Sequence, residues 1–215
     1  DETFNRRKFL KMGVTATGLG YAMAADPALA QAIQTDFQGI EGQEISFEVD
    51  GVKVPAYVSR PQKKSPQGWP VIVVVSEIFG VHEYIADVTR RFAKLGYLAI
   101  APEFFVRAGD PSAYGTIAEI QKEIIGKTSD AQVMKDMHAA IAWARANGGD
   151  IKRLGVTGFC WGGRITWLAS QQVQSVKAGV AWYGRLVGDK TAMTPSHPLD
   201  GVAQQKAPVL GLYGA

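Results

Sequence analysis

The sequence turns from a predicted strand at 154–158 into a predicted helix at 162–171 through the stretch Gly158-Phe159-Cys160-Trp161-Gly162-Gly163. Glycine two residues before and two residues after a reactive side chain is the spacing of a nucleophile elbow, here with cysteine in place of serine. The chain must reverse sharply at such a turn, so Gly158 and Gly162 are expected to lie against neighbouring backbone where a side chain would clash. This stretch predicts a nucleophilic cysteine at the end of a strand.

The predicted position of Cys160 suits thiol chemistry. At the N-terminus of a helix, the partial positive charge of the backbone favours the thiolate. The amide N–H of Trp161 would point to the place where an oxyanion forms. The alternative is a buried, inert cysteine beside packing glycines, and the glycine spacing and the strand-to-helix context favour the reactive interpretation.

Strands and helices alternate on both sides of this turn. Aspartate and glycine at 50–51 predict a tight turn between strands at 45–49 and 52–58, an N-terminal β-hairpin. The pattern downstream predicts strands at 71–75, 97–101, 154–158, 178–183 and 208–213, and helices around 85–95, 117–125, 131–146 and 162–171. Such alternation is typical of a single α/β domain, with a mostly parallel sheet and helices on both faces.

The composition of the chain excludes several kinds of site and partner. The chain has 215 residues, 47% of them hydrophobic and 20% charged, which is ordinary globular composition. A net charge of +3 is too small to indicate a nucleic-acid partner. The single cysteine excludes an intrachain disulfide and a Cys-based zinc site. We expect no cofactor, no metal site and no stable membrane span, because the sequence lacks a phosphate-cradling glycine loop and an apolar run of about 18 residues.

Three separated motifs stand out in the sequence: Ser76-Glu77-Ile78-Phe79-Gly80, Ala101-Pro102-Glu103-Phe104-Phe105-Val106-Arg107 and Gly158-Phe159-Cys160-Trp161-Gly162-Gly163. Together they resemble the dienelactone hydrolase family (carboxymethylenebutenolidase-like) of the α/β-hydrolase superfamily. The resemblance runs from about residue 45 to residue 215. All three motifs follow predicted strands, and ligands of open α/β sheets bind at the carboxyl ends of the strands.

The resemblance assigns roles to five residues. It implies that Cys160 attacks a small lactone or ester and forms an acyl-enzyme, and that Glu77 first partners the thiol or Arg107 and then helps to activate the thiol. Arg107 would bind a substrate carboxylate, and the amides of Ile78 and Trp161 would form the oxyanion hole. The alternatives are a solvated loop acid for Glu77 and an ordinary surface arginine for Arg107.

The chain departs from the family pattern near its end. The family needs an aspartate after the strand at 208–213 and a histidine after one further strand, and both would lie beyond Ala215. We therefore expect residues 31–215 to be a C-terminally incomplete hydrolase domain. His197 precedes that strand and so comes too early in the chain to be the catalytic base, while His82 and His138 are expected to face solvent or satisfied partners. The alternatives are a non-catalytic periplasmic binding protein on the same fold and a generalist esterase.

Residues 1–30 are expected to be an export signal rather than part of the fold. Asn5-Arg6-Arg7-Lys8-Phe9-Leu10-Lys11 resembles a twin-arginine motif, followed by a mildly apolar stretch and a small-residue cleavage pattern that ends at Ala24 or Ala30. The alternative is a basic, amphipathic helix. The motif predicts a periplasmic protein that meets the twin-arginine export machinery transiently.

Overall fold

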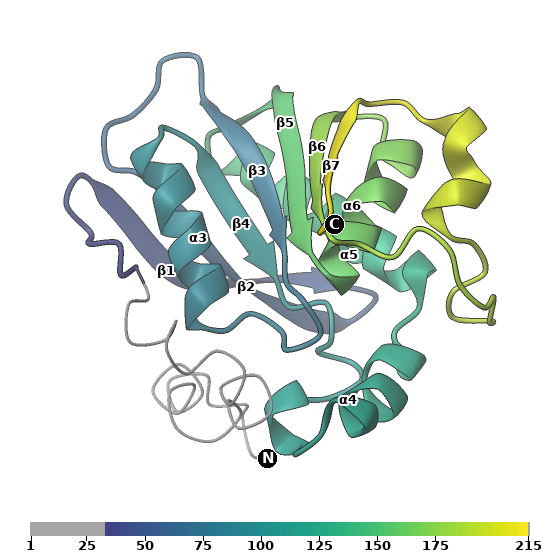
Figure 1. Ribbon diagram of the computed structural model, residues 1–215. Coiled ribbons are helices and arrows are strands. Elements are labelled where there is room, and N and C mark those ends of the chain that lie inside the picture. The colour runs from purple at the N-terminus through teal and green to yellow at the C-terminus, as the bar shows by residue number, and fades with distance from the viewer. Residues whose placement is uncertain (1–32, 215) are drawn as a thin grey trace.

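The computed structural model describes residues 33–214, which form one mixed sheet flanked by helices (Figure 1). The predicted signal segment lies outside the described residues. The elements in chain order are β1 (Ile40–Val49), β2 (Val52–Pro61), β3 (Trp69–Val75), α3 (Glu83–Lys94), β4 (Leu98–Pro102), η1 (Pro111–Ala113), α4 (Ile117–Glu123), η2 (Ile125–Lys127), α5 (Asp130–Ala146), β5 (Gly149–Phe159), α6 (Trp161–Gln172), β6 (Val176–Trp182), η3 (Pro198–Gln204) and β7 (Val209–Leu212).

The predicted hairpin is confirmed. Asp50 and Gly51 take the positive φ angles of a tight turn, 51° and 76°. Pairing extends as far as Ile40 opposite Pro61, so both strands are longer than the alternation of residue types suggested. The hairpin joins the rest of the sheet through antiparallel pairing of β2 with β4.

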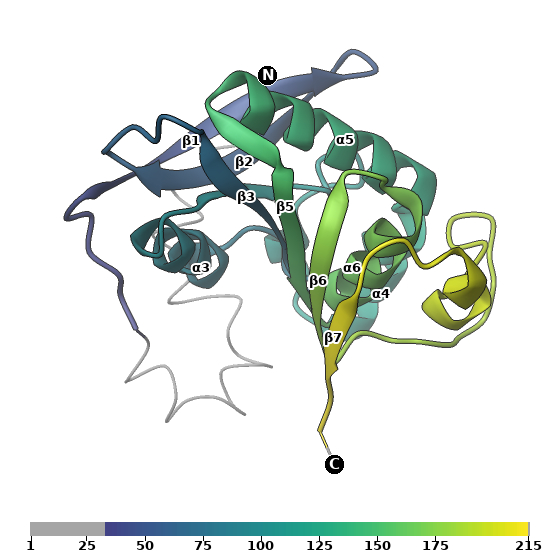
Figure 2. The ribbon, with the colours of Figure 1, turned by 90° about the horizontal axis from the view of Figure 1, so that it is seen from above.

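The remaining strands run parallel, in the order β4-β3-β5-β6-β7. Helix α3 covers one face of the sheet and helices α5 and α6 cover the other, as Figure 2 shows. Each face has its own core: Val74 and Ala101 pack with α3, whereas Val73 and Ile100 pack with α5 and α6. The predicted α/β fold with helices on both faces is therefore confirmed.

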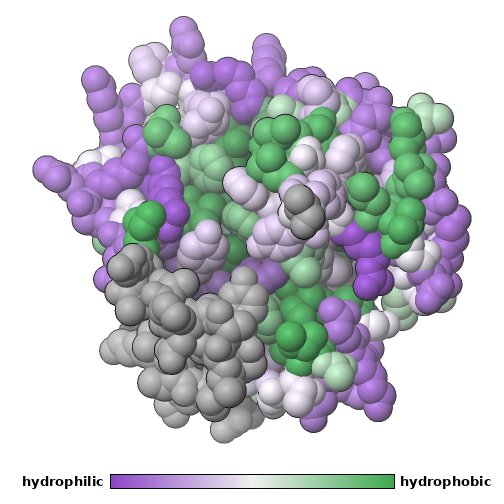
Figure 3. All heavy atoms as spheres, viewed as in Figure 1, coloured by the Kyte–Doolittle hydropathy of each residue, from purple (hydrophilic) through white to green (hydrophobic). Residues whose placement is uncertain are grey.

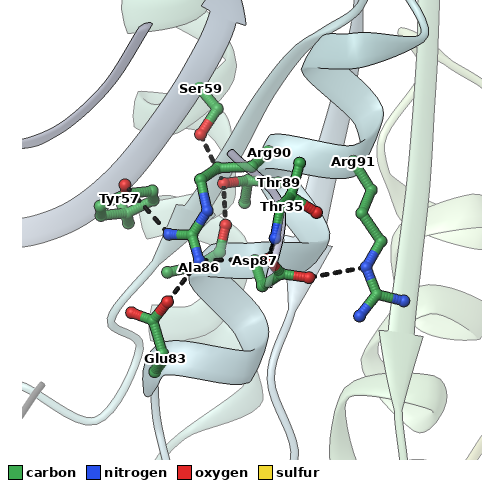
Figure 4. A network of polar contacts seen from close by, with 9 residues as sticks. All are labelled: Thr35, Tyr57, Ser59, Glu83, Ala86, Asp87, Thr89, Arg90 and Arg91. Carbon is green, nitrogen blue, oxygen red and sulfur yellow. Dashed lines mark hydrogen bonds and ion pairs between the residues drawn. The ribbon is translucent and has the colours of Figure 1, made fainter. Parts of the chain in front are cut away.

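A polar network on α3 binds the segment that precedes the sheet (Figure 4). The Asp87 carboxylate accepts hydrogen bonds from the Thr35 amide at 2.6 Å and from Arg91 Nε at 2.7 Å. Arg90 donates to Asp87 at 3.2 Å and to the Tyr57 hydroxyl at 3.3 Å. These contacts anchor the start of the described chain to α3.

Apolar side chains remain exposed on the β7 side of the molecule. Figure 3 shows a group of them over the η3 segment, where Leu199 and Val202 are each about 60% exposed. Leu210 on β7 is 57% exposed. None of the helices in the described part of the chain is long and apolar enough to span a membrane.

Candidate active site

Cys160 lies in a sharp turn between β5 and α6. Its backbone is left-handed, with φ of 54°, and its amide donates to the carbonyl of Trp182 at 2.9 Å. A Cβ on Gly162 would lie 2.5 Å from the carbonyl oxygen of Ser76, and a Cβ on Gly158 would collide with the carbonyl of Gly162. The steric reason for the two glycines is therefore confirmed, and positive φ at a non-glycine residue marks strain at the nucleophile position.

The thiol of Cys160 is exposed, but its surroundings raise its pKa above the usual value. Burial by the neighbouring protein is the main cause, and the negative charge of Glu77 adds to it. The Trp161 amide, which donates a hydrogen bond to the sulfur, and the positive charge of Arg185 oppose the rise. The pKa of the thiol is therefore raised, whereas its place at the helix N-terminus predicted a preference for the thiolate. Burial and the charge of Glu77 outweigh the Trp161 amide and the charge of Arg185.

Glu77 follows β3 and points one oxygen at His82. His82 Nε2 donates to Glu77 Oε1 at 2.7 Å. The second oxygen, Oε2, is buried and has no hydrogen-bond partner in the described part of the chain. The resting partner of Glu77 is thus His82, rather than the thiol or Arg107 as expected, while its charge still reaches Cys160.

Glu103 shapes the loop that carries Glu77. Its Oε2 accepts a hydrogen bond from the Val81 amide at 2.8 Å, and its side chain leaves no room for a Cβ on Gly80, which has φ of 76°. Within this loop, Ile78 is buried, and no described acceptor takes up its amide N–H. The free amide of Ile78 and the sulfur-bound amide of Trp161 are both compatible with the predicted oxyanion hole, which stays a prediction.

Arg107 does not take the expected position. Its Nη1 donates to Asp136 Oδ2 at 2.7 Å and its Nη2 donates to the carbonyl of Val49 at 3.1 Å. Asp136 is fully buried on α5, so Arg107 compensates its charge and ties the β-hairpin to that helix. The cation whose charge acts on the thiol is Arg185, which the motifs did not indicate.

The predictions for the histidines hold in part. His197 is buried beside Arg164, whose Nε donates to His197 Nδ1 at 3.3 Å, and it has no contact with Cys160 in the described structure. His138 is exposed on α5. His82 has a satisfied partner as predicted, but that partner is the candidate catalytic acid.

Two residues that act on the candidate site, His82 through Glu77 and Arg185 through its charge, were not predicted from the motifs, although their positions in the sequence could have indicated them. His82 lies five residues after Glu77, at the start of α3, and Arg185 lies three residues after β6. Both follow strands that end at the same edge of the sheet as β5, where ligands of such folds bind. The described residues contain no group of three or more His, Cys, Asp or Glu side chains that could hold a metal ion.

Comparison with known proteins identifies the family of the chain. Residues 54–215 match the sequence profile of the dienelactone hydrolase family. A protein of Methylorubrum extorquens named "Putative carboxymethylenebutenolidase" is 50% identical over 214 residues, which cover 99% of this chain and 72% of that protein. A protein of Escherichia coli K12 with the same name is 47% identical over 195 residues, which cover 91% of this chain and 72% of the relative.

Solved structures give the same result. A crystal structure titled as a putative dienelactone hydrolase from Klebsiella pneumoniae superposes with a TM-score of 0.80 at 50% identity, covering 82% of this chain and 73% of that chain. An acylaminoacyl peptidase shares only the fold, with a TM-score of 0.63 at 19% identity over 86% of this chain and 33% of its own. With Cys160 in a glycine-flanked elbow beside Glu77, and with these relatives, the chain belongs to the dienelactone hydrolase family.

Proposed function

We propose that this protein hydrolyses small esters or lactones through the thiol of Cys160. The observation that supports this proposal most directly is the elbow itself. It holds an exposed sulfur in a strained turn, against the Trp161 amide and within reach of the Glu77 charge. Strain at a single cysteine, with an amide donor and a partly buried acid nearby, is typical of an activated nucleophile.

The proposed reaction begins with transfer of the thiol proton to Glu77, because Oε2 is the carboxylate oxygen that lacks a partner. The thiolate then attacks the carbonyl carbon and forms a C–S bond, while the amides of Trp161 and Ile78 hold the oxyanion. Collapse of this intermediate breaks the C–O bond, and the leaving oxygen takes up the proton. The product of this half-reaction is a thioester on Cys160.

Hydrolysis of the thioester requires a base that activates water. His82 and His197 are bound to Glu77 and Arg164, so neither is placed for this step in the described structure. The family resemblance assigns the step to a histidine that follows one further strand after the strand at 208–213, and that assignment stays a prediction.

We propose Arg185, rather than Arg107, as the residue that favours acidic substrates. Its positive charge reaches the sulfur, and it has no ion pair with any described residue. Arg107 is held by Asp136 and the carbonyl of Val49. A free guanidinium beside the nucleophile suits the carboxylate of a dienelactone-like substrate.

The test is hydrolysis of a dienelactone and of an activated aryl ester by the full-length protein and its Cys160→Ala variant. We expect loss of at least about a thousandfold in rate, because the nucleophile is removed. Cys160→Ser should also lose most activity, since a serine hydroxyl needs a stronger base than a thiol. Equal rates for the wild type and Cys160→Ala would contradict the proposal.

A binding protein without turnover is a second candidate, because no described histidine contacts Cys160. An activated aryl ester separates the two. The hydrolase releases many equivalents of product per chain, whereas a non-catalytic protein with a reactive thiol releases one equivalent and then stops.

We also propose that the protein is exported to the periplasm, on the strength of the sequence motif at residues 5–11. Replacement of Arg6 and Arg7 by lysine should retain the protein in the cytoplasm. Cell fractionation and immunoblotting measure this directly. Unchanged export of the double variant would contradict the twin-arginine assignment.

A further inference from the structure

The contact between His82 and Glu77 is placed to control the thiol. His82 immediately precedes α3, and its Nε2 donates to Glu77 Oε1 at 2.7 Å. Both side chains are largely enclosed, with 23% and 18% of their surface exposed. The imidazole lies nearly parallel to the Tyr84 ring, at 6.3 Å and 20°. The imidazole that meets Glu77 is therefore a largely enclosed one, held by this hydrogen bond.

The neighbours of Glu77 leave its two oxygens in different situations. Oε1 is occupied by His82, whereas Oε2 is buried and unpartnered in the described chain. A buried carboxylate oxygen without a donor is costly, and such atoms concentrate where a site must accept a proton or a ligand. Because one oxygen is fixed by His82, the carboxylate cannot rotate freely away from the neighbouring thiol.

Charge around His82 favours its protonated form. Burial lowers the pKa of His82, but the charge and the hydrogen bond of Glu77 outweigh it, with smaller contributions from Glu103 and Glu83, so the net shift is upward. Glu83 is itself paired with Arg90, and Glu103 accepts the Val81 amide. Glu77 is therefore the carboxylate in this group that the imidazolium directly compensates.

We propose that His82 is a positioning residue for Glu77, which holds Oε1 so that Oε2 is left to take the thiol proton, and which offsets the negative charge of Glu77 at Cys160. His82 does not touch the reacting atoms in this role. It acts on the sulfur only through Glu77, whose charge disfavours the thiolate. The inference deepens the proposed function, because it states how the acid beside the nucleophile is controlled.

The experiment follows the reactivity of the thiol rather than turnover. The full-length protein contains one cysteine, so the rate of alkylation by the neutral reagent iodoacetamide, measured from pH 6 to pH 10, reports Cys160 alone. The variants are His82→Gln, which keeps a side-chain donor without the charge, and His82→Lys, which keeps a charge above the titration range of histidine. Glu77→Gln and the double variant Glu77→Gln/His82→Gln complete the cycle, and His138→Gln on the exposed face of α5 is the matched control.

We expect His82→Gln to lower the alkylation rate at pH 6 to 7, where the wild-type imidazole is protonated, by about three- to tenfold, because Glu77 then acts on the thiol without compensation. Glu77→Gln should raise the rate at the same pH. The double variant should match Glu77→Gln alone, since His82 acts through Glu77. His82→Lys should keep the profile near that of the wild type, and His138→Gln should leave it unchanged.

Two results would overturn the inference: an unchanged profile in His82→Gln, or additive shifts in the double variant, which would mean that His82 acts independently of Glu77. Circular dichroism of each variant identifies one that does not fold, and the His82→Lys and His82→Gln profiles then test the proposal separately. Failure of the proposed function is distinguishable, because a protein without esterase activity can still show the expected shifts in alkylation.

Discussion

Two histidine-containing clusters in this molecule are built in opposite ways. In the closed cluster, around Arg164, the guanidinium has a hydrogen-bond partner on each nitrogen. Its Nη1 and Nη2 donate to the two oxygens of Asp130 at 2.7 Å each, and Nη2 also donates to the carbonyl of Ser196 at 2.7 Å. His197 accepts from Arg164 Nε and donates to the carbonyl of Asp189 at 3.0 Å. In the open cluster, around Glu77, Oε1 accepts a hydrogen bond from His82 and Oε2 has no hydrogen-bond partner among the described residues.

The difference separates a structural cluster from a reactive one. The Arg164 cluster joins α6, the start of α5 and the chain before η3, and its charges are buried and paired. Such a cluster stabilises the fold only while it is complete. The Glu77 cluster has an acceptor oxygen without a partner near a strained thiol, so this oxygen can accept a proton during the proposed reaction. Four experiments test this contrast.

The largest effect is expected from breaking the closed cluster. Asp130→Ala leaves the Arg164 guanidinium buried without its carboxylate, which should lower the free energy of unfolding by about 3–5 kcal/mol. Urea unfolding at neutral pH measures it. His82→Gln, in the open cluster, is the comparison and should cost less than about 1 kcal/mol. Similar losses in both variants would remove the contrast between the two clusters.

The second-largest effect is expected from a change in the turn that holds Cys160, between β5 and α6. Gly162→Ala places a Cβ 2.5 Å from the carbonyl oxygen of Ser76, so the backbone between β3 and α6 must shift. We expect a loss of about 1–3 kcal/mol in unfolding free energy, as for other overpacked sites, together with loss of esterase activity. Gly115→Ala is the control, because its Cβ would meet only Glu119 at 3.9 Å. A stable, active Gly162→Ala protein would show that the close approach is not required.

The two arginines sharpen the contrast in substrate charge. Arg185→Ala should raise KM for an acidic ester by about tenfold and leave a neutral ester of similar size unaffected, since one charge-assisted contact is lost. Arg107→Ala should instead lower stability, because Asp136 is left buried without its cation, and should affect both esters alike. Steady-state kinetics on the matched ester pair gives the result. Selective loss of the acidic ester in Arg107→Ala would restore the role that the motif resemblance assigned to it.

The smallest expected effect is the pH dependence of stability at His82. The folded-state pKa of His82 is raised, so its contact with Glu77 stabilises the protein fully below the unfolded pKa of about 6.5 and is lost as pH rises through the folded value. The difference in unfolding free energy between wild type and His82→Gln should be greatest near pH 6, at about 1 kcal/mol or less, and should shrink as the pH rises through the folded-state pKa of His82. Urea titrations at three pH values measure it. A difference that grows with pH would have the wrong sign.

The sequence by itself determined the architecture. The β-branched run at 71–75 and the Asp-Gly turn at 50–51 indicated a buried strand and a hairpin, and both are present. These signals are local: residue spacing, turn chemistry and burial pattern act within a few positions of the chain. The elbow at Cys160 belongs to the same class, because the steric demand for its glycines arises within one strand-to-helix turn. Strand bounds were less accurate, since pairing with a neighbour extends a strand beyond its own pattern.

Only the tertiary structure decided which charged groups meet. Arg107 and Arg185 both lie in loops that follow strands of the sheet. Arg107 is paired with Asp136, which is 29 residues away in the sequence on α5, whereas the positive charge of Arg185 lowers the pKa of the thiol. The direction of the pKa shift at Cys160 also depends on neighbours from separate loops. Ion pairing and desolvation depend on distances between segments far apart in sequence, and long side chains reach several alternative partners. Local patterns contain no information about that choice.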